Sequence, residues 1–306
     1  MITDPAVWIT FIAVVGTLMV LDLGVLNRRS HVLSQKEALS WSAGITGIAL
    51  LFGVFLWLRL GSKAGLEYFA GYLIELSLSV DNLFVFLLIF QYFAVPAALQ
   101  PRVLKWGIFG AIVMRAIMIS AGVLLLQQFT WIVYLFGAIL VITGIRMFRV
   151  EEAHIDPEKN PLVRLARRLF PVTSAYEDQR FFVTRAAGGV LATPLLLVLL
   201  VVEWSDLVFA IDSIPAVFAV TRDPFIVYSS NLFAILGLRA LFFVLAGALD
   251  RFHYIKPGVA LILVFVGAKM ISSAWIHPST ALSLAVIVTI LFTSVVLSLL
   301  RPRTAT

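Results

Sequence analysis

Glu75-Leu-Ser-Leu-Ser-Val-Asp81-Asn82 and Asp206-Leu-Val-Phe-Ala-Ile-Asp212-Ser213 repeat one pattern at two places in the chain. Each copy holds two carboxylates six positions apart, followed by a small polar side chain, within an otherwise apolar run. A charge at the centre of a bilayer costs about 2.5 to 3.5 kcal/mol even on lenient scales, so acids there usually mark an ion or substrate path. The duplication predicts a cation site formed by Glu75, Asp81, Asn82, Asp206, Asp212 and Ser213.

The composition is that of an integral membrane protein. Hydrophobic residues make up 61% of the 306 positions, against about 45 to 50% in soluble domains. A helix needs about 20 apolar residues to cross a bilayer. Nine runs qualify: residues 7–27, 39–59, 70–93, 103–126, 129–149, 194–220, 226–247, 256–275 and 280–300. We therefore expect an all-α polytopic membrane fold with about nine transmembrane helices.

The absence of cysteine excludes disulfides, thiolate metal ligands and a thiol redox centre within the chain. The distribution of basic residues predicts the orientation. With the N-terminus outside, the inner loops and the C-terminus hold sixteen Lys and Arg residues, and the outer loops hold only Arg59, Lys63 and Arg222. Cytoplasmic loops carry the basic excess in membrane proteins. We expect an outside N-terminus and a cytoplasmic C-terminus.

Further features recur in the same order after each acidic copy. The next helix has a central arginine, Arg115 or Arg239, six residues after a phenylalanine. The helix after that has a Gly-x-basic-Met sequence, which begins at Gly144 in one case and at Gly267 in the other. Three helices per unit is an odd number, so the second unit enters from the opposite face. The order predicts an inverted repeat, whose site in transporters lies near the midplane of the bilayer.

This repeat divides the chain into five parts. They are two N-terminal transmembrane helices (1–69), the first three-helix repeat (70–149), a cytoplasmic linker (150–193), the second, inverted repeat (194–275), and the last transmembrane helix with a cytoplasmic tail (276–306). Residues 161–171 in the linker fit a short basic amphipathic helix on the inner membrane surface. A plain linker is the favoured interpretation.

Helical geometry separates the two acids of the first copy. At 100° per residue, Glu75, Ser79 and Asn82 lie within about 60° of one another, whereas Asp81 points about 120° away from Glu75. Either Asp81 pairs with another helix or this segment is locally unwound.

The expected membrane core contains more acids than bases. Arg115 and Arg239 face five carboxylates: Glu75, Asp81, Glu203, Asp206 and Asp212. A purely structural explanation is that each arginine pairs with one acid while the others are protonated, because burial disfavours the charged form. A bound cation is favoured because the acidic pair is duplicated together with Asn82 or Ser213. We expect supporting or charge-pairing roles for Asp22, Ser79, Arg115, Glu203 and Arg239. For Asp22, neutralisation by the adjacent basic residues is an equal alternative.

The ligand types restrict the ion. All candidate ligands are oxygens, which favours hard divalent ions such as Mn²⁺, Mg²⁺ and Ca²⁺. Zinc and copper sites normally use Cys or His, and the expected core has neither. A proton path through the same acids is an open alternative, and protons would also serve as the coupling ion. We expect no organic cofactor and no nucleic-acid partner for this bilayer protein.

Three pieces of sequence carry a family resemblance. They are Leu21-Asp22-Leu23-Gly24-Val25, Ser77-Leu-Ser-Val-Asp81-Asn82-Leu-Phe-Val85 and Glu203-Trp-Ser-Asp206-Leu-Val-Phe-Ala-Ile-Asp212-Ser213-Ile-Pro215. They resemble the TerC/Alx family of bacterial membrane proteins, within the LysE-like transporter superfamily. The resemblance implies nine helices, the inner membrane, and export of manganese from the cytoplasm. It also implies that Glu75, Asp81, Asp206 and Asp212 are metal ligands.

Three classes of function are consistent with these features. The first is a divalent-cation transporter, most simply a manganese exporter that exchanges the metal for protons. The second is a non-transporting membrane partner that delivers metal to secreted enzymes, assists membrane-protein assembly, or modulates redox state indirectly in connection with tellurite resistance. The third, an enzyme, is disfavoured because no His, Cys or Ser constellation in the core supplies a nucleophile and a base.

Overall fold

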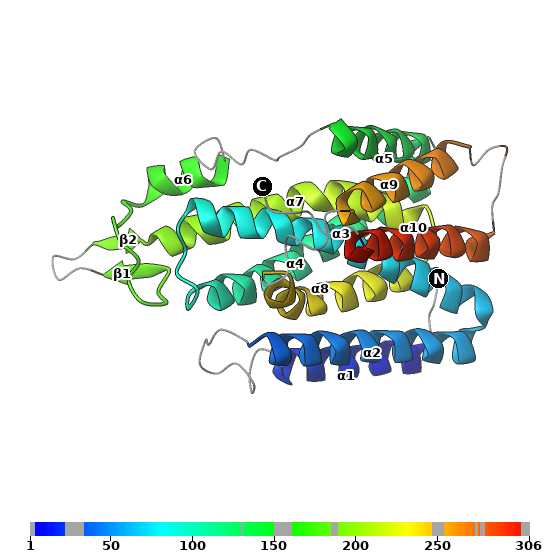
Figure 1. Cartoon of the computed structure of the whole chain (residues 1–306), viewed down its shortest axis with the longest axis horizontal. Coiled ribbons are helices and arrows are strands. Elements are labelled where there is room, and N and C mark those ends of the chain that lie inside the picture. Colours follow the sequence, from blue (N-terminus) through cyan, green and yellow to red (C-terminus); the bar gives the residue numbers. More distant parts are fainter. Residues whose placement is uncertain are drawn as a thin grey trace.

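The chain folds into a helical bundle whose long helices run along one axis of the molecule (Figure 1). This computed structural model describes residues 4–21, 34–129, 131–149, 161–184, 189–246, 254–272, 275 and 279–300, without the side chains of Asp81, Phe84 and Arg149. Its elements are α1 (Pro5–Met19), α2 (Gln35–Leu60), α3 (Ser62–Tyr92), α4 (Gln100–Gln128), α5 (Ile132–Arg149), α6 (Pro161–Leu169), β1 (Phe182–Thr184), β2 (Val190–Ala192), α7 (Pro194–Phe218), α8 (Pro224–Ala246), α9 (Ile255–Ile271) and α10 (Thr280–Leu300).

The protein is a multi-pass integral membrane protein of helical class. Six described helices are long and apolar enough to cross a bilayer: α2, α3, α4, α7, α8 and α10. The remaining hydrophobic runs also form helices, but α1, α5 and α9 span only 15, 18 and 17 residues. The count of nine transmembrane helices and the inverted repeat therefore stay predictions.

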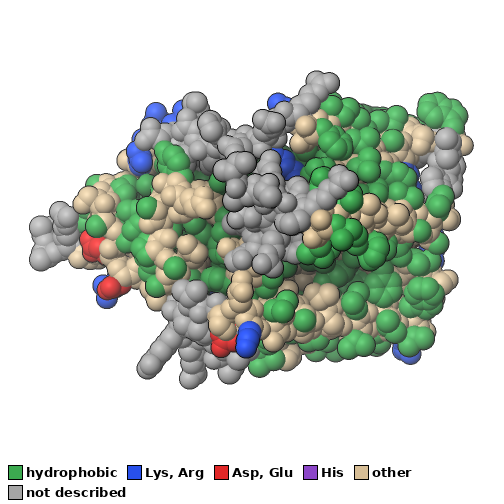
Figure 2. All heavy atoms as spheres, in the orientation of Figure 1, with side chains coloured by type: hydrophobic (Ala, Val, Ile, Leu, Met, Phe, Trp, Pro, Cys, Tyr) green, Lys and Arg blue, Asp and Glu red, His purple; other side chains and the backbone are tan. Residues whose placement is uncertain are grey.

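Apolar side chains cover the outside of the bundle, and charged side chains lie inside it. Leu58 of α2 and Phe292 of α10 are 81% and 69% exposed, whereas Glu75 and Arg115 are 0% and 1% exposed. Figure 2 shows hydrophobic side chains over most of the helical body, with charged ones mainly at its edges and near the end that carries α6 and the strands. This distribution suits a hydrocarbon solvent, in which exposed charge is costly.

The helix starts follow from local chemistry. Ser34 and Glu37 form a reciprocal capping box at the start of α2, in which the backbone N–H of Ser34 donates to Glu37 Oε2 at 2.9 Å. Prolines occupy the first position of α1, α7 and α8, where a missing N–H costs no helical hydrogen bond. Asp223 precedes α8 and accepts from the backbone N–H of Phe225 at 3.0 Å. These signals fix where the membrane helices begin.

The first acidic motif lies on a central helix. In their most apolar 18-residue windows, α8 is 83% buried and α3 is 62% buried, against 22% for α10. Helix α3 packs against α8, α7 and α2, and α4 packs against α7 and α8. Both motif helices are continuous through their motifs, since α3 is helical from Ser62 to Tyr92 and α7 extends beyond Pro215 to Phe218. Local unwinding at Asp81 is therefore not present.

Helices α5 and α9 pack closely through glycines. A Cβ atom at Gly267 would lie 2.6 Å from the carbonyl oxygen of Gly137, and one at Gly144 would lie 2.7 Å from the carbonyl oxygen of Ala260. These distances are too short for any side chain, and the neighbouring atoms belong to backbone that cannot turn away. Glycine at 144 and 267 therefore sets the distance between the two helices.

The linker is more structured than the sequence indicated. The linker contains α6, at the position where the sequence favoured a plain linker over an amphipathic helix. It also contains an antiparallel hairpin of β1 and β2, which was not predicted. This hairpin is the exception to an all-α fold. The hydroxyl of Tyr176 donates to the carbonyl of Phe93 at 2.7 Å, which ties the segment before β1 to the end of α3. Burial raises the pKa of Tyr176 to about 12, so it keeps this donor proton at physiological pH.

Replacing Gly267 by alanine should destabilise the protein. The new Cβ atom meets backbone at 2.6 Å, and overpacking of this kind costs about 1 to 3 kcal/mol. We expect a lower midpoint of thermal unfolding in detergent. Gly47→Ala on α2 is the matched control, because nothing lies within 4 Å of its added Cβ atom. Equal midpoints for the two variants would contradict the close packing of α5 and α9.

Candidate functional site: a buried ion-pair network

One guanidinium joins three helices in the core. Arg115 of α4 is 1% exposed and pairs with Glu75 of α3 and Asp206 of α7. Its Nη2 donates to Asp206 Oδ1 at 3.2 Å and its Nε donates to Asp206 Oδ2 at 3.5 Å, so the two groups meet in a two-pronged geometry. Nη1 donates to Glu75 Oε1 and, at 3.4 Å, to the hydroxyl of Ser213.

The helical repeat of the sequence places these side chains inside. Arg115 continues a buried stripe on α4 that includes Ala111 and Ile119, four residues before and after it. Asp206 and Ser213 lie on one buried stripe of α7. Helices α3 and α7 run in opposite directions, so the two acidic motifs face each other across the core (Figure 1).

Part of the first motif has buried polar atoms without partners. Glu75 and Ser79 are 0% exposed and Asn82 is 2% exposed. Among the described residues, Glu75 Oε2, Ser79 Oγ and Asn82 Nδ2 have no hydrogen-bond partner. Most buried polar groups in proteins are hydrogen-bonded. Two of these three atoms are oxygens, of the kind that hard cations bind.

The second carboxylate of the other motif is held separately. Asp212 is half-buried and accepts a hydrogen bond from Thr143 Oγ1 of α5 at 3.0 Å. Sequence reasoning did not identify Thr143, and its only signal was its position directly before the repeated Gly144. The side chain of Asp81 and all of Asp22 lie outside the described residues. The structure thus brings Glu75, Asp206 and Ser213 to one guanidinium and holds Asp212 apart.

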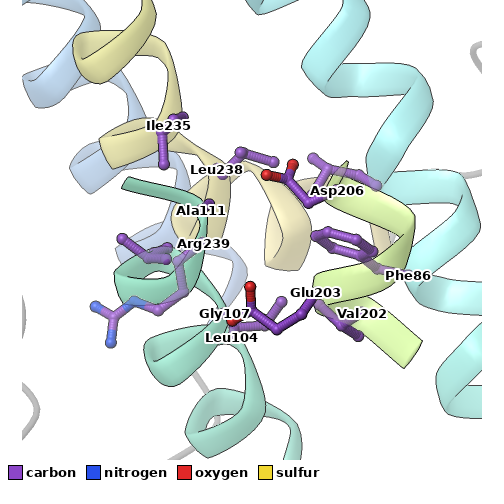
Figure 3. Close-up of a pocket in the computed structure, with 12 residues that line it drawn as sticks. Phe86, Leu104, Gly107, Ala111, Val202, Glu203, Asp206, Ile235, Leu238 and Arg239 are labelled. Atoms are coloured by element: carbon purple, nitrogen blue, oxygen red, sulfur yellow. The ribbon is translucent and has the colours of Figure 1, made fainter. Parts of the chain in front are cut away.

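A small cavity adjoins the ion pair (Figure 3). Its volume is about 20 Å³, which is room for about one water molecule. Apolar side chains such as Leu104, Ala111 and Leu238 line it together with Glu203 and Asp206.

Two other charged residues singled out from the sequence, Glu203 and Arg239, also line this cavity, but their side chains extend in different directions (Figure 3). The carboxylate of Glu203 lies over Gly110 of α4, where an added Cβ atom would overlap it. Arg239 also lines the cavity and is 2% exposed, but in Figure 3 its guanidinium extends away from Asp206. Arg239 is thus not the structural equivalent of Arg115, although both occupy the same place in the repeated pattern.

Within the part of the chain that the structure describes, no three His, Asp or Glu side chains form a group that could hold a metal ion. The described carboxylates Glu75 and Asp206 instead share one positive charge, that of Arg115. The structural explanation from the sequence was that each arginine pairs with one buried acid. Arg115 does pair with buried acids, although with two rather than one. This pairing leaves Glu75 Oε2 and Ser79 Oγ unexplained.

The chain is similar to known membrane proteins over nearly its full length. The sequence pattern of the integral membrane protein TerC family matches residues 60–306. An uncharacterized membrane protein of Myxococcus xanthus is 51% identical over 99% of this chain and 94% of its own length. The putative membrane-bound redox modulator Alx of Escherichia coli is 48% identical, over 94% of this chain and 92% of its own length. No solved structure matches.

Replacing Arg115 by glutamine should strongly destabilise the protein in the absence of added metal. The change leaves Glu75 and Asp206 buried without a counter-charge, which typically costs about 3 to 5 kcal/mol. Arg59→Gln is the matched control, because Arg59 pairs with Asp4 at 3.6 Å with its side chain 58% exposed, and such pairs contribute little. Thermal unfolding in detergent measures both, and equal midpoints would show that Arg115 does not hold the network.

Proposed function

This chain belongs to the TerC family of integral membrane proteins, and from this premise we propose that it carries divalent metal cations across the membrane. One observation supports the proposal above others. The first acids of the two repeated motifs, Glu75 and Asp206, meet in the core around a single positive charge. Buried acids that converge from two helices of opposite direction suit a cation site near the middle of a transporter.

The proposed ligands are oxygens from both motifs. Glu75, Ser79 and Asn82 supply them from α3, and Asp206 and Ser213 supply them from α7. Asp81 and Asp212 complete the proposed set, although Asp212 accepts a hydrogen bond from Thr143 of α5 in this structure and would have to turn toward the site. Such a set fits a hard divalent ion. The choice of manganese and export as the direction rest on the family resemblance, and protons as the coupling ion rest on the proton path that the same acids could form.

The proposed architecture has about nine transmembrane helices in the inner membrane, with an inverted three-helix repeat and the N-terminus outside. Helix packing supports the repeat. In the repeat, α3 corresponds to α7 and α4 corresponds to α8. A contact of α3 with α8 therefore implies an equivalent contact of α7 with α4, and both contacts occur. When the sequences of the two units are aligned at Gly144 and Gly267, residue 137 aligns with residue 260. Under this alignment the contact of Gly137 with Gly267 in one unit order corresponds to the contact of Ala260 with Gly144 in the other.

A second candidate function follows from the name of several relatives, putative membrane-bound redox modulator. Because this chain has no cysteine, a redox role would be indirect, through a partner protein or through a metal. This alternative predicts a partner that co-purifies in fixed ratio and no metal flux from the isolated protein.

Metal flux in proteoliposomes tests the proposal. Purified protein should transport Mn²⁺ into liposomes that contain a metal-quenched dye. Glu75→Gln and Asp206→Asn should each reduce the rate by about tenfold or more, because loss of a supporting group alone costs 10 to 100-fold at metal sites. Glu177→Gln, which alters an exposed carboxylate before β1, should keep the wild-type rate. Wild-type flux no greater than that of empty liposomes would contradict the transport function.

Reporter fusions test the orientation. Alkaline phosphatase fused at the C-terminus should be inactive, because the enzyme needs the oxidising outer compartment. A fusion truncated after Gly61, between α2 and α3, should be active. The opposite pattern of activities would contradict the proposed topology, but it would not bear on the proposed metal site.

A further inference from the structure

The guanidinium of Arg115 occupies the place where a cation between the two motifs would bind. Resting on the transport function proposed above, we infer that Arg115 is a tethered counter-ion that pairs with Glu75 and Asp206 as in this structure and moves to Glu203 when a divalent cation binds. Arg115 thereby couples metal binding to a change in the partners of α4.

Competition for the same oxygens carries the first step. Arg115 holds both oxygens of Asp206 and one oxygen of Glu75. A divalent ion that binds these carboxylates would be within a few ångströms of a guanidinium in a site of low dielectric constant, where like charges repel strongly. The arginine cannot lose its proton at accessible pH. It must therefore move when the metal binds.

Glu203, which lines the adjoining cavity, supplies the second position. Long side chains on a helix point toward its N-terminus, so Arg115 extends toward Ala111, which lines the cavity together with Glu203 and Asp206. Glu203 precedes Asp206 by three residues, about one turn of α7. A shift of about one helical turn, roughly 5 Å, brings the guanidinium from one acid to the other.

Glu203 is suited to receive the arginine. It lies in a largely apolar cavity, and within the described part of the chain no hydrogen bond or ion pair of its carboxylate is present. The carboxylate lies against Gly110, on the same helix that carries Arg115. After the shift, the metal neutralises Glu75 and Asp206 while Arg115 neutralises Glu203. The two positive charges of the metal and the one of Arg115 then balance the three carboxylates.

A double-mutant cycle tests the inference. Binding of Mn²⁺ and of Mg²⁺ is measured by titration calorimetry on the purified full-length wild type, Arg115→Gln, Glu203→Gln and the double variant. Arg115→Gln should bind Mn²⁺ about tenfold more tightly, and Glu203→Gln about tenfold more weakly, than wild type. In the Arg115→Gln background, Glu203→Gln should change the affinity less than about twofold, because coupled residues are not additive. Arg59→Gln is the control for removal of a charge.

Each other outcome overturns the inference or the function beneath it. If Glu203→Gln weakens binding equally in both backgrounds, Glu203 is a metal ligand and the two-position arginine is wrong, while transport stands. If Arg115→Gln binds no more tightly than wild type, competition is wrong. If neither wild type nor Arg115→Gln binds either ion, the proposed transport function fails as well.

The stability of Arg115→Gln provides a second measurement. Because the metal replaces the lost positive charge, Mn²⁺ should raise the unfolding midpoint of Arg115→Gln more than that of wild type. If the variant elutes as aggregate without metal, extraction in Mn²⁺ should restore a monodisperse peak. Failure of Mn²⁺ to stabilise the variant in either assay would overturn the inference. Arg115→Lys, which keeps the charge, should show wild-type stabilisation by Mn²⁺.

Discussion

The structure depends on giving buried charges a partner inside a bundle that is apolar on the outside. Removing carboxylates from water is expensive, and attraction to a buried arginine offsets that cost only when the geometry is good. Arg115 meets this requirement with hydrogen bonds to Glu75, Asp206 and Ser213. Because these partners come from α3 and α7, the one guanidinium also fixes how three helices sit together. The remaining packing, including the glycine contact of α5 with α9, surrounds this network.

The same network limits what the site can do. A structural ion pair would satisfy all of its members, because unsatisfied buried polar atoms cost free energy without return. Here Glu75 Oε2 and Ser79 Oγ are fully buried and have no partner among the described residues. A protein that only needed Arg115 for stability would have no use for Ser79 there. A site that accepts a further cation has such a use.

Sequence periodicity predicted which faces are buried but not which side chains meet. The 100° rule grouped Glu75, Ser79 and Asn82, and all three are buried. The repeat also singled out Arg115. Periodicity could not find Thr143, because a threonine in an apolar helix has no distinguishing spacing and its partner Asp212 lies 69 residues away. The hairpin of β1 and β2 was missed because strands of three residues are too short for an alternating pattern to register.

The proposed inverted repeat would account for the unequal roles of Arg115 and Arg239. If two units are related by an approximate two-fold axis, Glu75 and Asp206 are equivalent acids on either side of it, and the space between them is shared. Only one guanidinium fits in that space, because a second one would repel the first at short range and low dielectric constant. One arginine must therefore lie elsewhere, and Arg239 extends away from Asp206. A symmetric sequence thus cannot give a symmetric charge network, and the asymmetry leaves Glu203, rather than a second arginine, beside the shared pair.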